Sequence, residues 1–380
     1  MDQQIVLVTG GAGFIGSHLI PKILAAGKHV RVLDPLTVQV HGALPKDLEW
    51  LSQEGVEFIR GSVTSPADWL RALDKVSAVV HLAAETGTGQ SMYEVAKYNE
   101  VNSQGTALLF EALSKMPGHS VERVLLSSSR SVYGEGAYLN PSLANQRVTP
   151  ESRSGEDLAA AHWEPRCKAT GAQLVLVPTR EDDLIRPASI YAATKYAQED
   201  LVRIGCQSMG IGYVIFRLQN VYGERQSLSN PYTGILSIFS TKIRRGSELP
   251  LFEDGEESRD FVHVDDVTDA LLKGLLTDKA INDVVNVGSG VATSVRVVAE
   301  ELTRAFSKQP NVVVTGQFRI GDIRHNYADI SRLKEQLGIE PKITLAAGLK
   351  RFAQWVESQP LPVDMLEKAN QELRDRKLMN

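Results

Sequence analysis

The chain has 380 residues, of which 43% are hydrophobic and 23% are charged, and its formal net charge is −5. This length predicts two lobes around a large core, and the weak negative charge disfavours binding to nucleic acid. No apolar run reaches the ~18 residues of a membrane helix, so we expect a cytoplasmic protein without a membrane partner. Only Cys167 and Cys206 occur, too few for a disulfide framework or a four-cysteine metal site, and no metal is expected.

The first half of the chain alternates short β-branched runs with helical stretches, which is typical of a parallel sheet covered by helices. We therefore expect an α/β fold with a doubly wound parallel sheet. In chain order, the expected strands are 5–9, 29–34, 56–60, 78–82, 123–127 and 213–217, and the expected helices are 13–26, 66–73, 92–116 and 190–209.

The second half of the chain is less regular. Residues 136–186 are rich in Pro, Ser, Glu and Arg and end in a strand-like run at 173–177, which predicts an insertion lying over the cleft. Further on, we expect helices at 232–245, 295–306 and 345–356 and a strand at 284–288. The predicted division is a cofactor-binding domain over 1–222 and a smaller, interleaved substrate-binding lobe over 223–380, from which some segments return to the first domain.

The segment TGGAGFIG, residues 9–16, follows the first predicted strand and opens the first predicted helix. Glycines at positions 10, 13 and 16 allow a tight turn, close approach to a pyrophosphate and close packing of helix on strand. Asp34 ends the second predicted strand, where a carboxylate can bind both ribose hydroxyls and repel a 2′-phosphate. The pattern predicts a Rossmann-type domain that binds NAD rather than NADP.

YAATK, residues 191–195, places a phenol and an ammonium one turn apart on the same helix face. A tyrosine has a pKa of about 10, so acting as a base near neutral pH needs roughly 4 kcal/mol of phenolate stabilisation. Lys195 and an oxidised nicotinamide would supply it. The Tyr-x-x-x-Lys spacing alone occurs by chance on many helices. However, serines 127–129 follow the fifth apolar run, where a hydroxyl can bind an oxygen that gains charge.

With these features together, the chain resembles the extended short-chain dehydrogenase/reductase family, the NAD-dependent nucleotide-sugar epimerases and dehydratases. The resemblance covers residues 5–355. Its motifs are TGGAGFIG (9–16), HLAA (81–84), VNSQGT (101–106), SSSRSVYG (127–134), YAATK (191–195), RLQNVYG (217–223), RDFVHVDDV (259–267) and NVGSG (286–290).

The resemblance implies a role for each matching residue. The implied catalytic residues are Ser129, Tyr191 and Lys195. The implied NAD-binding residues are Gly10, Gly13, Phe14, Ile15, Gly16, Asp34, Ser62, Val63, Leu82, Ala83, Ala84, Asn102, Tyr191 and Lys195. The implied substrate-binding residues are Ser129, Asn220, Arg259 and Arg324, of which the two arginines would clamp a diphosphate; surface salt bridges are the alternative for them. A homodimer through the helices predicted at 92–116 and 190–209 is also implied.

Arg130 and Ser131 separate this chain from two branches of that family. The dehydratases have Asp-Glu directly after the catalytic hydroxyl, and the decarboxylases keep a glutamate there. Neither arginine nor serine can perform that carboxylate chemistry, which leaves an epimerase or a ketoreductase. Because reductases commonly use NADPH, Asp34 favours the epimerase.

Local motifs narrow the group further. GTGQSMYEV (87–95), YGEGAY (133–138) and RIGDIRHNYADI (319–330) resemble the bacterial dTDP-L-rhamnose 4-epimerase group, which forms dTDP-6-deoxy-L-talose through a 4-keto intermediate. Two positions depart from the pattern: Thr170 replaces the second cysteine of that group's insert, and Ser62 replaces an aspartate that contacts adenine. UDP-glucose 4-epimerase, a ketoreductase and a catalytically silent NAD-binding scaffold remain as alternatives.

Overall fold

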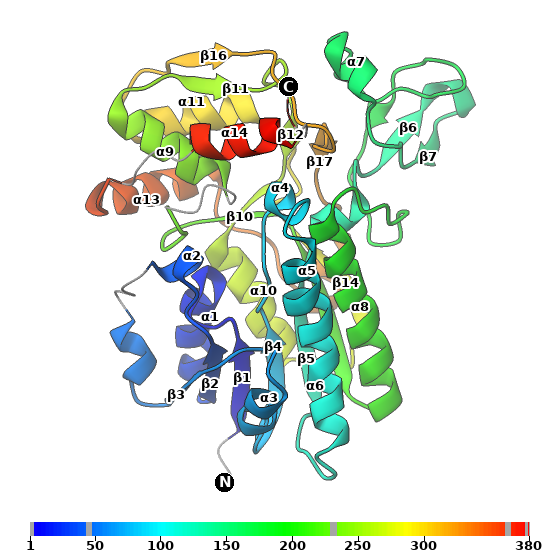
Figure 1. Cartoon of the computed structure of the whole chain (residues 1–380). Helices are drawn as coiled ribbons and strands as arrows, with labels where there is room; N and C mark the ends of the chain where they lie inside the picture. Colours follow the sequence, from blue (N-terminus) through cyan, green and yellow to red (C-terminus); the bar gives the residue numbers. More distant parts are fainter. Residues whose placement is uncertain (1–3, 43–47, 229–233, 362–365, 377–378, 380) are drawn as a thin grey trace.

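Seven parallel strands form the central sheet of the computed structural model, which describes all residues except 1–3, 43–47, 229–233, 362–365, 377–378 and 380 (Figure 1). The strand order is β14-β9-β5-β4-β1-β2-β3. The strands are β1 (Ile5–Thr9), β2 (His29–Asp34), β3 (Val56–Arg60), β4 (Val76–His81), β5 (Arg123–Ser129), β9 (Gly212–Leu218) and β14 (Asp283–Val287). The order reverses beside β1, which is where doubly wound sheets bind ligands. The predicted fold class is confirmed.

Helices cover both faces of this sheet, because its strands send alternate apolar side chains to opposite sides. On β1, Val6 and Val8 belong to one apolar cluster and Leu7 to the other. The first cluster packs against α1 (Phe14–Ala25), α10 (Val264–Leu276) and α12 (Ser331–Leu337), and the second against α3 (Pro66–Ala72), α6 (Gly105–Ser114) and α8 (Ile190–Met209).

The helix predicted over 92–116 is divided. A short helix α4 (Thr88–Ser91) comes first, and a second helical stretch runs through α5 (Val95–Tyr98), a π-helical turn (Asn99–Gln104) and α6. Asn102 lies in the π-helical turn, and its buried side chain bonds the backbone of Glu85 and the hydroxyl of Thr194. π-Helical turns inside helices often occur at functional sites, and this one supports the loop that follows β4.

The C-terminal half forms a second lobe above the sheet in Figure 1. Its own core lies between α9 (Ile235–Arg245), α11 (Val295–Ala305) and α13 (Leu345–Ser358). Its short strands pair as β10 (Asn220–Tyr222) with β13 (Phe261–His263), β11 (Leu249–Leu251) with β16 (Val312–Val314), and β12 (Ser258–Arg259) with β15 (Thr293–Ser294) and β17 (His325–Asn326). Near the C-terminus is α14 (Leu366–Asp375). The predicted helix start at Tyr232 lies outside the described residues.

Residues 136–186 form a small antiparallel sheet of β6 (Tyr138–Asn140), β7 (Gln146–Val148) and β8 (Val175–Leu176), with the short helix α7 (Gly155–Ala159). The strand-like run at 173–177 is therefore mostly irregular. The insertion stands beside the C-terminal lobe in Figure 1. No described residue of this insertion lines the main cavity, so its place over the cleft stays a prediction. Arg153 holds the insertion in place through a 2.8 Å ion pair with Glu253.

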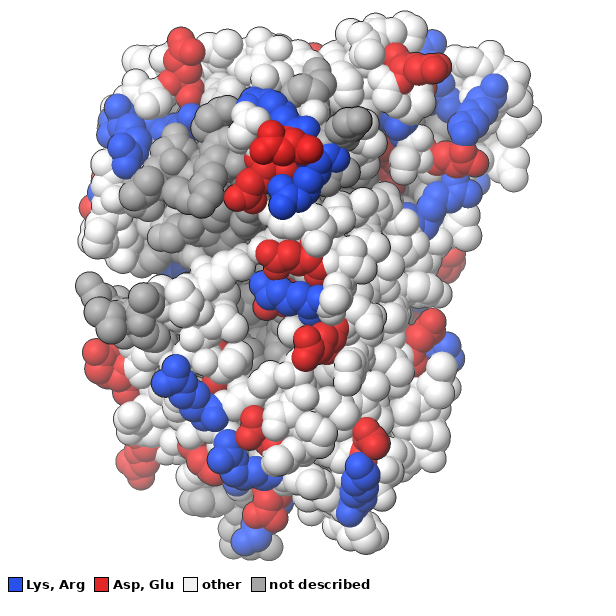
Figure 2. Space-filling view, viewed as in Figure 1, with Lys and Arg blue, Asp and Glu red and all other residues white. Residues whose placement is uncertain are grey.

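Charged side chains are mixed on the face shown in Figure 2, where acidic and basic groups alternate rather than gathering by sign. Within the described part of the chain, no helix is both long and apolar enough to cross a bilayer. Likewise, the described residues contain no group of three or more His, Cys, Asp or Glu that could hold a metal ion.

Candidate active site

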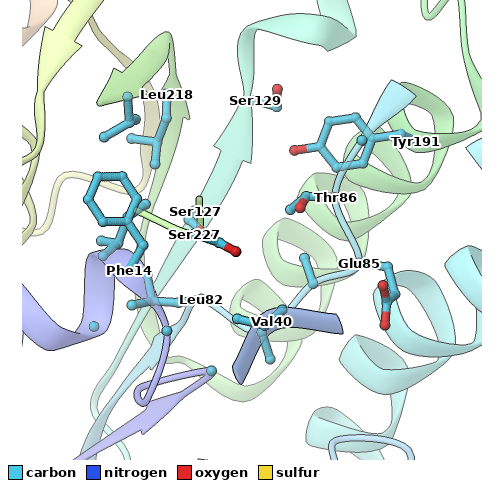
Figure 3. A pocket seen from close by; sticks show the side chains of 18 of the residues that line it. Phe14, Val40, Leu82, Glu85, Thr86, Ser127, Ser129, Tyr191, Leu218 and Ser227 are labelled. Atoms are coloured by element: carbon cyan, nitrogen blue, oxygen red, sulfur yellow. The ribbon is translucent and has the colours of Figure 1, made fainter. Parts of the chain in front are cut away.

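A cavity of about 680 Å³ opens at the carboxyl ends of the central strands and is lined by both lobes (Figure 3). Thr9, the last residue of β1, is in register with Leu33 of β2 and His81 of β4, so the loops after these strands meet at one edge. Of the residues predicted from sequence, the cavity is lined by Gly10, Gly13, Phe14, Ile15, Gly16, Asp34, Ser62, Val63, Leu82, Ala83, Ala84, Ser129, Tyr191, Lys195 and Asn220.

The glycine turn after β1 is closed so tightly that two of its positions exclude side chains. Gly10 has φ +66°, and a Cβ there would lie 2.8 Å from the backbone of Ala83. A Cβ on Gly16 would lie 2.2 Å from the carbonyl oxygen of Gly11. The turn leads into α1, whose N-terminus has no side-chain cap, so its backbone N–H groups are available to an anion. This cradle fits the pyrophosphate of a dinucleotide.

Asp34 ends β2 at the wall of the cavity, as predicted. One carboxylate oxygen accepts a hydrogen bond from the backbone N–H of Leu36 (2.9 Å), and the other accepts one from Ala12 in the glycine turn (3.2 Å). Burial raises the pKa of Asp34, and these bonds and nearby His41 oppose that increase. The carboxylate thus supports the turn and faces the site where an adenosine ribose would lie.

Replacing Asp34 by Ser is expected to reduce the preference for NAD over NADP by at least tenfold, or about 1.4 kcal/mol. The substitution removes the negative charge that repels a 2′-phosphate. Calorimetric titration of cofactor-free protein with each dinucleotide measures the ratio, with exposed Asp74→Ser as the control. An unchanged ratio in a folded Asp34→Ser protein would contradict the role of Asp34.

Two predicted cofactor residues have structural partners of their own. The Ser62 hydroxyl bonds Thr64, and the Ser62 backbone N–H donates to Asp68 (3.0 Å). Asn102 is fully buried and does not line the cavity. Its side chain instead fixes the backbone of Glu85, which does line it. The structure therefore places Asn102 behind the cavity wall, where it positions a loop.

Ser129 and Tyr191 come together although 61 positions separate them in the chain. Tyr191 projects from the first turn of α8, and its hydroxyl points toward Ser129 at the end of β5 (Figure 3). The Ser129 oxygen accepts hydrogen bonds from the backbone N–H of Ser131 (3.2 Å) and from its hydroxyl (3.0 Å). Burial raises the pKa of Tyr191, while the hydrogen bond with Ser129 and the charge of Arg130 lower it.

Lys195 lies one helical turn after Tyr191 and is 2% exposed. Its ammonium donates to the carbonyl of Ser127 (2.7 Å) and to the side chain of Gln198 (2.8 Å). Burial lowers the pKa of Lys195 to about 7, against the opposite effect of Glu199. The ammonium is thus held at a fixed place and is close to its titration midpoint at neutral pH.

The two arginines predicted to clamp a diphosphate do not line the cavity. Arg324 is 1% exposed, and carboxylates of Glu164, Glu253 and Asp254 surround its guanidinium at 2.7 to 3.0 Å. Arg259 bonds Asp322 (3.1 Å) and three backbone carbonyls. The structure does not support a clamp at Arg324, because a diphosphate would have to displace three carboxylates.

Comparison of this chain with known proteins shows the family to which it belongs. The family described as NAD dependent epimerase/dehydratase matches residues 6–162 and 168–288, more than half of the chain. The protein belongs to the NAD-dependent epimerase/dehydratase family. The fit of the glycine turn and Asp34 to a dinucleotide agrees with this membership, which makes NAD the cofactor.

Relatives within the NAD-dependent epimerase/dehydratase family include several epimerases. The dTDP-L-rhamnose 4-epimerase of Burkholderia thailandensis is 37% identical over 94% of this chain and 96% of its own length. The crystal structure of UDP-glucose 4-epimerase from Thermotoga maritima with UDP-glucose has a TM-score of 0.73 at 30% identity, covering 93% of this chain and 99% of that one. The UDP-glucuronic acid 4-epimerase of Bacillus cereus, solved with UDP-glucuronic acid and NAD, also has a TM-score of 0.73, at 25% identity and the same coverage.

The site contains residues that the family motifs did not reveal. Glu85, Thr86, Gln226 and Ser227 line the cavity although no role was predicted for them. The Ser131 hydroxyl donates to Ser129. The sequence signals only the backbone part of this turn, because a serine side chain often bonds the backbone N–H two residues further on. The others lie on loops whose approach to the cavity depends on tertiary packing.

Proposed function

We propose that this protein is an NAD-dependent nucleotide-sugar 4-epimerase that interconverts dTDP-L-rhamnose and dTDP-6-deoxy-L-talose. The observation that carries the reaction type is the convergence of Ser129, Tyr191 and Lys195 on one cavity, beside a glycine turn built for a dinucleotide. The 37% identity to the dTDP-L-rhamnose 4-epimerase of Burkholderia thailandensis supports the choice of sugar.

The residues of this site can take one proton from the sugar and return it. Tyr191, directed at the cavity, removes the proton of the sugar 4-hydroxyl and later returns it. The Ser129 hydroxyl receives two hydrogen bonds from Ser131, so its own proton is free to donate to Tyr191 or to the sugar oxygen. Bound NAD⁺ supplies a hydride acceptor that can return the hydride to either face of the 4-keto sugar.

The positions after Ser129 favour epimerisation over elimination or decarboxylation. Arg130 and Ser131 both line the cavity, and neither carries a carboxylate. Glu85 also lines the cavity, but it does not belong to the Ser129–Ser131 segment. Its carboxylate lies 3.3 Å from the ammonium of Lys97. The site therefore has an acid/base at Tyr191 and lacks a second acid/base pair beside the catalytic serine.

Proton NMR of the purified protein with dTDP-L-rhamnose and no added cofactor tests the proposal. We expect new signals of the 4-epimer until both sugars reach equilibrium. Conversion of UDP-glucose to UDP-galactose instead would keep the mechanism and reject the sugar. Absence of both conversions after adding NAD⁺, with turnover of a 4-keto sugar on adding NADH or NADPH, would identify a ketoreductase; a protein inactive in every assay would be a binding scaffold.

The homodimer stays a prediction. Four apolar residues of the helix predicted at 92–116 are buried in the core of the single chain, so they do not indicate an interface: Leu108, Leu109, Ala112 and Leu113. On α8, Ala197 and Leu201 are partly exposed and Ile204 is 56% exposed. This stripe on α8 is the surface that the proposed dimer would cover.

A further inference from the structure

Arg130 differs from the other arginines around the site because it lines the cavity, and the two carboxylates whose charges act on it, Asp322 and Glu135, form no ion pair with it. It begins a short 3-10 helix (Arg130–Tyr133) directly after Ser129. Its Nε donates to the side-chain oxygen of Asn220 (3.0 Å), and no ion pair joins it to any described residue. By contrast, each of three nearby arginines is bonded to a carboxylate: Arg217, Arg259 and Arg324.

We propose that Arg130 is a positioning residue that stabilises negative charge on the oxygen of Tyr191 during proton transfer. Lys195 would stabilise the same charge from α8, while Arg130 would do so from the end of β5. The inference rests on the acid/base role of Tyr191 in the proposed function. It adds a cation that the family motif of serine, tyrosine and lysine does not include.

The state of Lys195 explains why a second cation is useful. With a pKa of about 7, Lys195 loses part of its charge near neutral pH, and two of its N–H groups are already bonded to Ser127 and Gln198. Burial and the nearby charge of Arg259 lower the pKa of Arg130, the charges of Asp322 and Glu135 oppose that decrease, and a guanidinium stays protonated at neutral pH. The Arg130 guanidinium therefore remains charged where Lys195 loses part of its charge.

The other groups around Tyr191 do not provide a competing cation. The ring of Tyr98 from α5 packs edge-on against the Tyr191 ring at 6.4 Å, and Ser91 from α4 accepts the Tyr191 backbone N–H. On the β5 side, the neighbours are Ser129 and Arg130, whose charges and hydrogen bond both favour the phenolate. Glu85, an acidic residue of the cavity wall whose charge acts on Tyr98, is paired with Lys97 (3.3 Å).

Arg130 also fixes the amide of Asn220. Because the Asn220 side-chain oxygen accepts the Arg130 Nε–H, its amino group is left as the donor at the cavity wall. Arg130 is held in turn by this bond, since Asn220 lies in β10, which pairs with β13 of the second lobe. The same contact therefore holds Arg130 at the wall of the cavity that Tyr191 also lines, and it aligns a predicted sugar-binding residue.

Titration of Tyr191 in NAD-loaded protein without any sugar tests this proposal. Phenolate absorbance is followed against pH in wild type and Tyr191→Phe, and their difference isolates Tyr191. The same difference is then measured in the Arg130→Gln and Arg130→Lys backgrounds. We expect the Tyr191 midpoint to rise by about one pH unit or more in Arg130→Gln, as for loss of a nearby opposite charge, and by less in Arg130→Lys.

Arg203→Gln is the matched control. Arg203 lies on α8, the helix that carries Tyr191, but it forms an exposed ion pair with Asp200. An unchanged midpoint in Arg130→Gln, or an equal rise in Arg130→Lys, would overturn the proposal. A higher KM with an unchanged midpoint would assign Arg130 to substrate binding alone and also overturn it. Arg130→Met provides a second neutral variant if Arg130→Gln does not fold. Because no sugar is present, a wrong substrate assignment leaves this result unaffected.

Discussion

Tyr191→Phe is expected to lower epimerase turnover by about 10³-fold, within the range for loss of a general acid–base group, while NAD remains bound. The substitution removes only the hydroxyl that points toward Ser129. The ring contact with Tyr98 and the start of α8 at Ile190 remain, because neither uses the hydroxyl. The loss should therefore appear in kcat without loss of the fold.

Progress curves by proton NMR measure turnover of this variant, and cofactor absorbance after denaturing the purified protein measures its NAD content. Tyr196→Phe is the matched control, because Tyr196 lies on the same helix and does not line the cavity. Turnover of Tyr191→Phe within tenfold of wild type would contradict the assignment. Loss of NAD together with turnover would indicate a structural role for the hydroxyl instead.

Arg217→Met is expected to destabilise the protein by about 3–5 kcal/mol, the cost of breaking a buried ion pair. Arg217 lies in β9 and bonds both oxygens of buried Glu199, at 2.9 and 2.7 Å. It also donates to the Tyr133 hydroxyl (2.8 Å) and to the carbonyl of Glu181 (2.9 Å). Removing the guanidinium leaves the buried Glu199 carboxylate without its ion-pair partner, with only the Ser128 hydroxyl bonded to it and the charge of Lys195 nearby.

Urea denaturation of the purified protein gives the change in the free energy of unfolding. The control is Arg203→Met, whose exposed pair with Asp200 should change that free energy by less than about 0.5 kcal/mol. A second replacement, Glu199→Met in the Arg217→Met background, should recover part of the loss because it removes the unpaired charge. A single Arg217→Met variant as stable as wild type would show that Glu199 is not isolated from water.

The central sheet could be predicted from the sequence because its strands are buried on both faces and therefore read as short apolar runs. Strands β1, β2 and β3 have the predicted bounds, and β5 extends two residues further, to Ser129. The positions of the glycine turn and of Asp34 could also be predicted from the sequence. Their positions depend on local geometry, a tight turn and a strand end, which a few neighbouring residues determine.

Other features depend on contacts between distant segments. Arg324 lies in a motif that predicted a diphosphate clamp. In the structure its guanidinium instead binds Glu164, which lies in the insertion, 160 positions earlier in the chain. Similarly, Asn102 in the π-helical turn bonds Glu85 and Thr194, and the helical periodicity of 92–116 carries no information on these partners. Periodicity and motif spacing describe one segment at a time, so neither arrangement could be predicted from them.

The late position of β14 in the chain has a consequence for biosynthesis. This strand pairs with β9, and its Asn286 accepts a hydrogen bond from Tyr133 (2.7 Å). On the ribosome, the first six strands emerge well before residue 287, so β9 remains an open edge until translation has passed that point. Open strand edges promote aggregation, so the growing chain carries this hazard until β14 covers the edge of β9.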